Sequence, residues 1–296
     1  MVGTRTEAAA PPGSDTLPRG DYCQLGETVV YTAHHYDAFN TEPRIASYIG
    51  IALGQLPPEH YFAAWRAFPD TRRWSQRAEP VGAWRTYLCV DVFEGAYVHG
   101  DQWIVPSWGG SMFEALMPTL VVPEARWGAK SWALTHPLYV QAQIDFGLQE
   151  ARYGYWGFSP ARDPEGGYRE YGVPLLGMAP SGYPAAGVVT PHAVLLALAF
   201  APHATLANLA ALRRSFPSVY GAGGFKDSVN VTTGRVAECY LALDQGMVMA
   251  AITNQLLADR LPGYLACTLQ GALQPLMAME EFSVGASADQ KRTAHG

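Results

Sequence analysis

Apolar residues recur at helical spacing along most of this chain. The first such segment places Ile45, Tyr48, Ile49 and Leu53 on one face, and Asn40 or Thr41 can cap its start. Gly54 then marks its end, because glycine is common just after the last helical turn. Equivalent patterns predict helices at residues 41–54, 58–68, 111–121, 131–151, 191–200, 203–214, 242–260 and 262–277.

Strand signals are sparse. Residues 81–98 could hold a hairpin or a loop, and Pro137 predicts a kink within the helical segment 131–151. Helices joined by tight loops, without alternating strands, indicate an all-α fold built from antiparallel helix pairs.

Composition narrows the function class. The chain has 296 residues, 49% of them hydrophobic, which suffices for one large domain or two small ones. Its 26 acidic residues outnumber 20 basic ones, and no Lys/Arg cluster exceeds two residues, so nucleic acid is not an expected partner. The 8 Trp and 16 Tyr are numerous, and such side chains often line sites for sugars.

Metal, cofactor and membrane signals are weak. The histidines show no HExxH or paired spacing, so neither a metal nor another cofactor is expected. No apolar run of 18 residues and no secretory signal occur, so we expect no membrane span and take the cytoplasm as the default location. Free, mostly buried thiols are expected for the four widely spaced cysteines, Cys23, Cys89, Cys239 and Cys267.

Carboxylates stand out where the predicted helices begin and in the loops between them. Glu114 follows a Gly-Gly-Ser turn in WGGSMFEALMP, where a buried carboxylate must be paired, protonated or facing a wet pocket. Asp163 and Glu165 lie in the loop YGYWGFSPARDPEGGYREY, and Asp227 lies in VYGAGGFKDSVN. Asp244 begins a later helix, where the exposed N–H groups favour an acid.

The residues alone leave structural alternatives open for every one of these acids. Glu114 could accept hydrogen bonds from loop N–H groups, Asp227 could cap a turn, and Asp244 could cap its helix. Asp163 and Glu165 could be solvated loop charges.

An ordered series of segments resembles the glycoamylase-like family of bacterial glycoside hydrolases. That family includes endo-β-1,2-glucanases and the transglycosylation domain of cyclic β-1,2-glucan synthases. The resemblance covers residues 36–260 and begins with YDAFNTEPRIASYIGIALGQLPPEHYF. The later segments are WGGSMFEALMP, FGLQEARYGYWGFSPA, REYGVPLLGM, GVVTPHAVLLALAFAPHATLANLAAL, YGAGGFKDSVN and LDQGMVMAAITNQL.

The resemblance implies an (α/α)6 toroid, or a shortened version of it, with catalytic loops at one end. Residues 31–280 would form this single barrel domain, between a disordered leader at 1–30 and a flexible tail at 281–296. About eight helices are predicted where such a barrel needs twelve, which favours a reduced or truncated barrel.

Residue by residue, the resemblance implies catalytic acids. Glu114 matches the acid ending an SGSMFE-type turn, and Asp227 matches the acid of the GF-x-(D/E)-A segment. Asp163 or Glu165 matches an acid placed before a Gly-Tyr element. Pro160 stands where the synthases carry the glutamate of WGISES, which argues against transglycosylation. The expected substrate-binding residues are Trp108, Trp156, Tyr168, Arg169, Tyr171, Phe225, Lys226 and Gln245.

Glycosidic-bond cleavage needs one carboxylic acid to protonate the leaving oxygen and one carboxylate to activate water or attack directly. We therefore predict a glycoside hydrolase that cleaves a β-glucan, preferably β-1,2-linked, with inversion. Asp163, Glu165 or Glu114 would be the proton donor, and Asp227 or Glu114 the base. The alternatives are a member that binds or organises glycan without turnover, and a glucan transglycosylase. The expected partner is an oligo- or polysaccharide, and the oligomeric state stays open.

Overall fold

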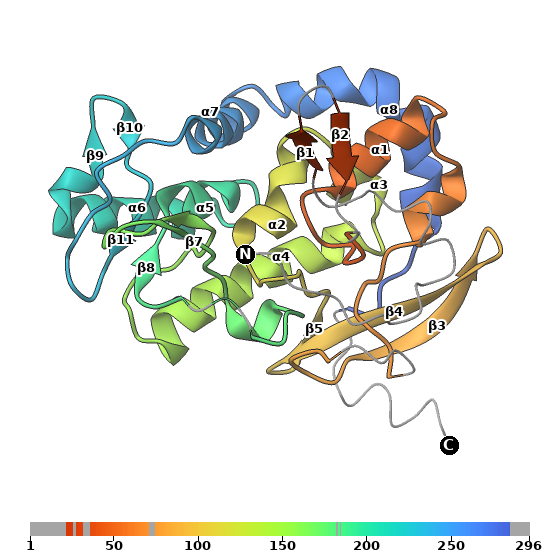
Figure 1. Cartoon of the computed structure of the whole chain (residues 1–296), viewed down its shortest axis with the longest axis horizontal. Helices are drawn as coiled ribbons and strands as arrows, with labels where there is room; N and C mark the ends of the chain where they lie inside the picture. The colour runs from red at the N-terminus through yellow and green to blue at the C-terminus, as the bar shows by residue number, and fades with distance from the viewer. Residues whose placement is uncertain are drawn as a thin grey trace.

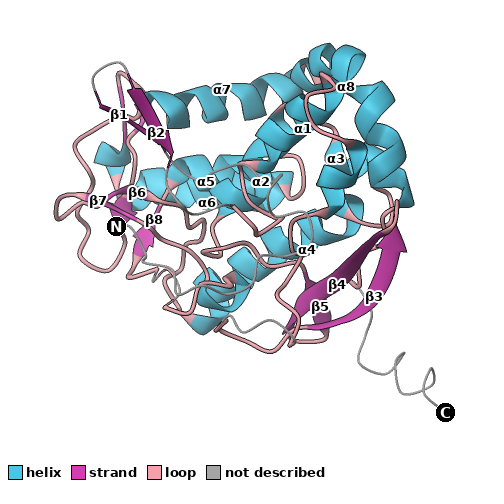
Figure 2. Ribbon diagram, turned by 45° about the vertical axis from the view of Figure 1, so that its right-hand side comes forward, coloured by secondary structure: helices cyan, strands magenta, loops and turns pink. Residues whose placement is uncertain are grey.

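The computed structural model describes residues 22–25, 28–31, 36–70, 75–181, 183 and 185–284. Helices are the main regular structure of the described chain, and they lie between a three-stranded sheet at one end and the short strand pairs β6–β7, β8–β11 and β9–β10 at the other (Figures 1 and 2). The α-helices are α1 (Arg44–Ala52), α2 (Met112–Leu116), α3 (Glu124–Trp127), α4 (Trp132–Asp145), α5 (Pro191–Leu196), α6 (Pro202–Ser215), α7 (Ala242–Leu256) and α8 (Arg260–Met279).

Shorter helical segments extend or connect these helices. The 3-10 segments are η2 (Pro58–Phe62), η3 (Met117–Leu120), η5 (Pro174–Leu176) and η6 (Pro217–Val219). A π-helical segment, η4 (Phe146–Glu150), continues α4 directly, so the two together cover the predicted helix 131–151. None of the described helices is both long enough and apolar enough to cross a membrane.

The larger hydrophobic core surrounds α2 and α5. All six residues of α5 are buried, and α5 contacts α2, α6 and α7. Helix α6, by contrast, buries one side, formed by Thr205, Asn208, Leu209 and Leu212. Because α5 is short and buried, the longer, half-exposed helices pack around it. Their starts and the adjoining loops therefore lie close to one another in the interior.

A second core joins the first and last helices to the sheet. Helix α1 packs against α8, and the apolar side chains of both meet Trp132 at the start of α4. The sheet has the order β3-β4-β5, with β3 (Val81–Tyr87), β4 (Val90–His99) and β5 (Gln102–Ile104) antiparallel to their neighbours. Val92, Ala96 and Trp103 of this sheet contribute to the same core.

The remaining strands are two to four residues long and form antiparallel hairpins or pairs. They are β1 (Tyr22–Leu25) with β2 (Thr28–Tyr31), β6 (Ala161–Arg162) with β7 (Tyr168–Arg169), β8 (Val188–Val189) with β11 (Val229–Asn230), and β9 (Tyr220–Gly221) with β10 (Gly224–Phe225). The β6–β7 and β9–β10 pairs fold the two acid-bearing loops into compact hairpins.

The structure differs from the sequence predictions at the chain ends and in several helices and strands. The β1–β2 hairpin falls largely within the predicted disordered leader, while residues 1–21 lie outside the described chain. Phe282 and Val284, at the start of the predicted tail, are buried against the second core, and residues 285–296 lie outside the described chain. The predicted helix 58–68 is the short segment η2, and α3 was not predicted. A mostly helical fold is confirmed, but the sheet and hairpins mean that it is not all-α.

The cysteines also differ from expectation. Cys89 and Cys267 are exposed and Cys239 is half-buried, and all three are free thiols. The prediction of mostly buried thiols is therefore wrong for the described cysteines.

Candidate active site

Three side chains meet where helices α5 and α7 begin. His192 is the second residue of α5, Asp244 lies in the first turn of α7, and Asp227 precedes β11. The His192 Nδ1 atom lies 3.7 Å from Asp227 Oδ1 and 3.5 Å from Asp244 Oδ2. These residues are 3%, 1% and 6% exposed, so we call them the buried triad.

Hydrogen bonding around the triad is incomplete. Asp227 Oδ2 accepts the backbone N–H of Arg162 at 2.5 Å, and the Asp227 N–H donates to the Cys239 carbonyl at 3.1 Å. The facing atoms, His192 Nδ1, Asp227 Oδ1 and Asp244 Oδ2, are buried without a hydrogen-bond partner. Asp244 also makes no side-chain cap of α7, so its expected capping role is not the one that the structure shows.

Burial changes the protonation of the triad. Loss of solvent, followed by the neighbouring Asp227, raises the pKa of Asp244 to about 9. Burial lowers the pKa of His192 to about 4, although Asp227 opposes this shift. At neutral pH, Asp244 therefore holds a proton beside Asp227, and the imidazole is uncharged.

Further acids gather around two tyrosines next to the triad. Burial, then the charges of Asp244, Asp227, Glu170 and Glu42, raises the pKa of Tyr168 to about 12. Tyr168 is 61% exposed, so its ring gives the group a solvent-facing side. We call Glu42, Glu170, Asp227 and Asp244 the acidic group.

Glu42 has a raised pKa in this group. Burial, followed by the charge of Glu114, raises the pKa of Glu42 to about 7. The charges of Glu114, Glu170 and Glu42 also raise the pKa of Tyr183, after burial. Residues from the starts of α1, α2 and α7 and from two loops thus share one electrostatic environment.

Glu114 is held as a helix cap. It is the third residue of α2, and it forms a capping box with Ser111. Its carboxylate accepts Ser107 Oγ at 2.9 Å, Gly109 N at 2.8 Å and Ser111 Oγ at 2.7 Å. Burial raises the pKa of Glu114, while these hydrogen bonds oppose the rise. The adjacent Gly110 has φ 78°, and a Cβ there would lie 2.1 Å from Val173 O, so the turn requires glycine.

The two predicted loop acids are engaged in pairs of their own. Asp163 accepts Tyr171 Oη at 2.5 Å and pairs with Arg169 Nε at 2.9 Å. Burial alone would raise the pKa of Asp163, but these partners and the Glu165 N–H lower it below its usual value. Glu165 forms an exposed ion pair with Arg235. Both acids line a surface pocket of about 720 Å³ that also includes Arg162, Cys239 and Leu241.

The predicted sugar-binding side chains divide by burial. Trp156 and Tyr171 are 2% and 1% exposed, so their rings lie in the interior of this structure. Trp108 and Phe225 are partly buried against core clusters. Among the expected binding residues, Tyr168 and Arg169 are the exposed ones.

Lys226 and Gln245 hold the second loop in place. Lys226 Nζ lies 2.5 Å from Glu238 Oε2, and Gln245 Nε2 donates to Phe225 O at 2.8 Å. These contacts fix the segment that carries Asp227, so both residues position an acid in this structure.

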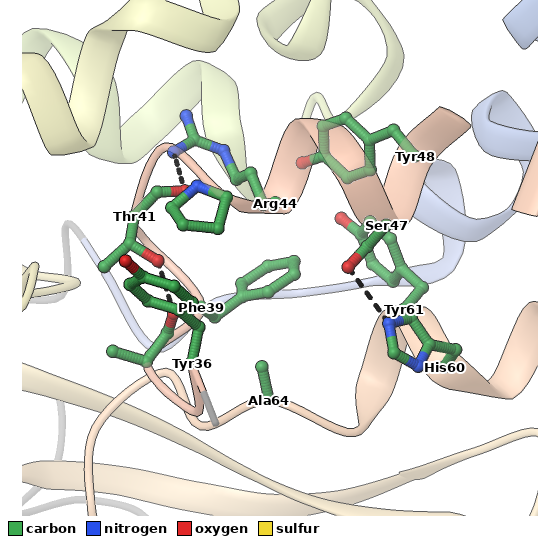
Figure 3. Close-up of a pocket in the computed structure, with 11 residues that line it drawn as sticks. Tyr36, Phe39, Thr41, Arg44, Ser47, Tyr48, His60, Tyr61 and Ala64 are labelled. Carbon is green, nitrogen blue, oxygen red and sulfur yellow. Dashed lines mark hydrogen bonds between the residues drawn. The ribbon is translucent and has the colours of Figure 1, made fainter. Parts of the chain in front are cut away.

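A separate cavity beside the start of α1 is too small for a glycan. Its volume is about 20 Å³, which is room for one water molecule. Figure 3 shows Arg44 directed to Thr41, and Ser47 directed to His60, among the aromatic side chains that line it.

Sequence reasoning missed Glu42, Glu170 and His192. Glu42 stands just before Pro43 at a helix start, a position that favours acids, but this signal does not separate a catalytic acid from a helix-stabilising one. His192 was set aside because metal-binding spacing was sought within one segment. Its partners come from residues 35 and 52 positions later.

Comparisons with known proteins agree with the fold. An endo-β-1,2-glucanase from Talaromyces funiculosus in complex with sophorose has a TM-score of 0.57 at 12% identity, covering 88% of this chain and 51% of that one. An endo-β-1,2-glucanase from Chitinophaga pinensis, in complex with sophorotriose and glucose, has a TM-score of 0.53 at 18% identity, covering 77% and 52%. These structures share the mostly helical fold with this chain.

Sequence comparison identifies the family. A family model described as putative glucoamylase matches residues 77–260. The cyclic β-(1,2)-glucan synthase NdvB of Rhizobium meliloti (strain 1021) is 37% identical over 234 residues, which are 74% of this chain and 7% of NdvB. The chain belongs to the glycoamylase-like family. It spans about half the length of the solved relatives, 51% and 52%, and a small part of NdvB.

Proposed function

We propose that this chain is a glycoside hydrolase that cleaves β-glucan, with β-1,2 linkages preferred. The observation that carries the proposal is the acidic group, in which Asp227, Asp244 and Glu42 come from three separate segments and all act on the pKa of the exposed Tyr168. Perturbed carboxyl pKa values at a shared site are typical of acid/base catalysis. Family membership and the glucan names of the relatives support the choice of substrate.

Asp227 is the base in this proposal. Its two neighbours in the buried triad favour that role, because Asp244 carries the proton at neutral pH and His192 is uncharged. The Arg162 N–H holds Oδ2, which leaves Oδ1 to accept a proton from water.

Glu42 is the proton donor. A donor must be protonated before the reaction and must lose its proton readily, so a pKa near 7 suits the task. Asp163 suits it less, because its pKa is lowered and its oxygens are already engaged. Glu114 has a supporting role in this proposal. Its carboxylate holds the turn at the start of α2, and its charge raises the pKa of Glu42.

The stereochemical proposal is inversion. The facing atoms of the buried triad lie within 4.8 Å of one another, which is closer than the donor and the base of an inverting enzyme. An inverting enzyme needs carboxyl groups about 6.5–9.5 Å apart, which is why the donor is placed on the α1 side of the group. We propose that the fold is a shortened α/α toroid whose helix starts form this catalytic end.

The decisive experiment separates hydrolysis from binding. The whole chain is incubated with linear β-1,2-, β-1,3-, β-1,4- and β-1,6-glucans, and the products are chromatographed. We expect cleavage of the β-1,2-glucan, with the α anomer formed first as seen by NMR. Asp227→Asn and Glu42→Gln should each lower kcat by about 10²–10⁴-fold and retain sophorose binding.

Glu165→Gln is the matched control, because Glu165 is an exposed loop acid outside the acidic group. Its activity should stay within about twofold of the wild type. Turnover that survives Asp227→Asn would refute the assigned base. Sophorose binding without cleavage of any glucan would instead identify a glycan-binding family member.

A further inference from the structure

The unsatisfied centre of the buried triad has the geometry of a cation site. Its three facing atoms, one imidazole nitrogen and two carboxylate oxygens, are buried and lack hydrogen-bond partners. Buried polar atoms in a folded protein are normally satisfied, so three unpartnered atoms within 4.8 Å of one another suit a bound cation.

The distances fit metal coordination better than direct hydrogen bonding. His192 Nδ1 lies 3.5 Å from Asp244 Oδ2 and 3.7 Å from Asp227 Oδ1. Two ligands about 2.0–2.1 Å from a tetrahedral cation lie about 3.4 Å apart, close to both separations. Three protein ligands would leave the fourth position to water or another small ligand.

A backbone hydrogen bond holds one of the proposed ligands, Asp227, in place, and a surface pocket lies next to it. The Arg162 N–H holds Asp227 Oδ2, which orients Oδ1 toward the imidazole, as outer hydrogen bonds commonly do at metal sites. Arg162 and Cys239 both contact Asp227 through their backbones, and both line the surface pocket of about 720 Å³. The pocket wall is thus one backbone contact away from Asp227.

We propose that His192, Asp227 and Asp244 bind one divalent transition-metal cation of the Zn²⁺ type, and that the bound cation inhibits hydrolysis. A mixed nitrogen and oxygen donor set suits Zn²⁺, whereas Ca²⁺ prefers six to eight oxygen ligands. The inhibition rests on the proposed function, because the metal would take the Asp227 oxygen that acts as the base. The binding does not depend on that function.

Calorimetric titration of the metal-free chain with Zn²⁺ tests the binding. We expect one Zn²⁺ per chain, with affinity at least tenfold lower in His192→Ala and in Asp244→Asn, and no competition from equimolar Ca²⁺. Circular dichroism shows whether each variant is folded, and His192→Gln replaces His192→Ala if the alanine variant is not. The absorption of bound Co²⁺ reports direct coordination independently of any activity.

Two matched variants exclude other zinc-binding groups. His99 lies 3.9 Å from Asp145 in a partly exposed pair, and Cys239 is a free thiol beside Asp227. His99→Ala and Cys239→Ser should bind Zn²⁺ within twofold of the wild type. Absence of binding in the wild type, unchanged binding in folded His192 variants, or loss of binding in Cys239→Ser alone would each overturn the site.

Activity is a separate readout. Zn²⁺ should inhibit glucan cleavage with a midpoint that follows the calorimetric Kd, and EDTA should restore the rate. If no glucan is cleaved, the proposed function fails while the titration still decides the metal site. Full activity at saturating Zn²⁺ would overturn the inhibition.

Discussion

At the scale of single residues, buried charges depend on partners from distant segments. Glu124 of α3 accepts Arg44 Nε at 2.7 Å and Tyr48 Oη at 2.8 Å, and its other oxygen lies 3.0 Å from His136 Nε2. Burial would raise the pKa of Glu124, but Arg44 and His136 lower it to about 2. The carboxylate is therefore ionised over the whole physiological range and ties α1 to α3 and α4.

This network predicts an acid-sensitive fold. The folded pKa of Glu124 is about 2 against an ordinary 4.5, so its stabilisation is complete above pH 4.5 and is lost as the pH falls toward 2. Burial also lowers the pKa of His136. As the pH falls, the unfolded chain therefore binds a proton at His136 that the folded chain does not, and stability is lost further. Urea unfolding between pH 7 and 3 should show a steeper loss of free energy for the wild type than for Glu124→Gln, and parallel curves would contradict the assignment.

The raised pKa of Glu42 predicts how activity falls at high pH, along the basic limb of the pH profile. Because the proposed donor must be protonated, kcat/KM should fall about tenfold per pH unit above pH 7. Glu114→Gln removes the charge that contributes to the raised pKa of Glu42, so the limb should move to lower pH in that variant. An unmoved limb, measured at a temperature where the variant is folded, would show that another group titrates.

At the scale of elements, the start of α2 is fixed by its own sequence. Ser111, Glu114 and Gly110 form the capping box and its turn within five residues. Arg44 then binds the far end of α2, donating to the carbonyls of Glu114 and Ala115 at 2.9 and 2.7 Å. A five-residue helix is too short to be stable alone, so these end contacts maintain it.

Capping predicts a graded loss of stability. Ser111→Ala should lower the free energy of unfolding by about 1 kcal/mol, as for other N-caps. Glu114→Gln should cost about 2 kcal/mol, because an amide NH2 would face several buried donors. Ser215→Ala, which removes an exposed hydrogen bond with Tyr155, should stay within about 0.5 kcal/mol. Thermal unfolding measures all three, and equal losses would rule out the capping account.

At the scale of the whole molecule, residues near the two ends of the described chain close the second core. Arg66 Nε donates to Glu280 Oε1 at 2.7 Å, and Tyr61 Oη donates to Glu280 Oε2 at 2.7 Å. Trp132 Nε1 donates to Tyr61 Oη at 3.0 Å, so α4 joins the same network. Segments more than 200 positions apart are thus locked together in the interior.

Glu280 and its neighbour Glu281 provide a matched comparison. Glu280→Gln removes the nearer of two buried carboxylates beside Arg66 and leaves Glu94, at 3.8 Å, as the other, so it should cost about 3–5 kcal/mol. Glu281→Gln removes an exposed pair with Arg85 at 3.1 Å and should cost no more than about 1 kcal/mol. Chemical denaturation of both variants measures the difference, and similar midpoints would argue against a closing role for Glu280.

Sequence patterns located most helices because helical spacing is a local property. The predicted helices 131–151, 203–214 and 262–277 fall within a few residues of the observed ones. The short helix α3 has too few residues to show periodicity, and its buried Glu124 depends on the charge of Arg44 and on a hydrogen bond with His136. The aromatic composition likewise did not separate the exposed Tyr168 from the buried Trp156.

By itself, the sequence determined the helical class, the family and the presence of acids at helix starts and in loops. Those properties depend on spacing, motif and residue type, which are local. The tertiary structure decided which acids share an environment: it engaged Glu114 in a cap and Asp163 in an ion pair, and it brought His192, Asp227 and Asp244 within 4.8 Å. Burial and Coulomb interactions depend on distances through space. At the buried triad they arise between residues up to 52 positions apart along this chain, which local sequence patterns do not relate.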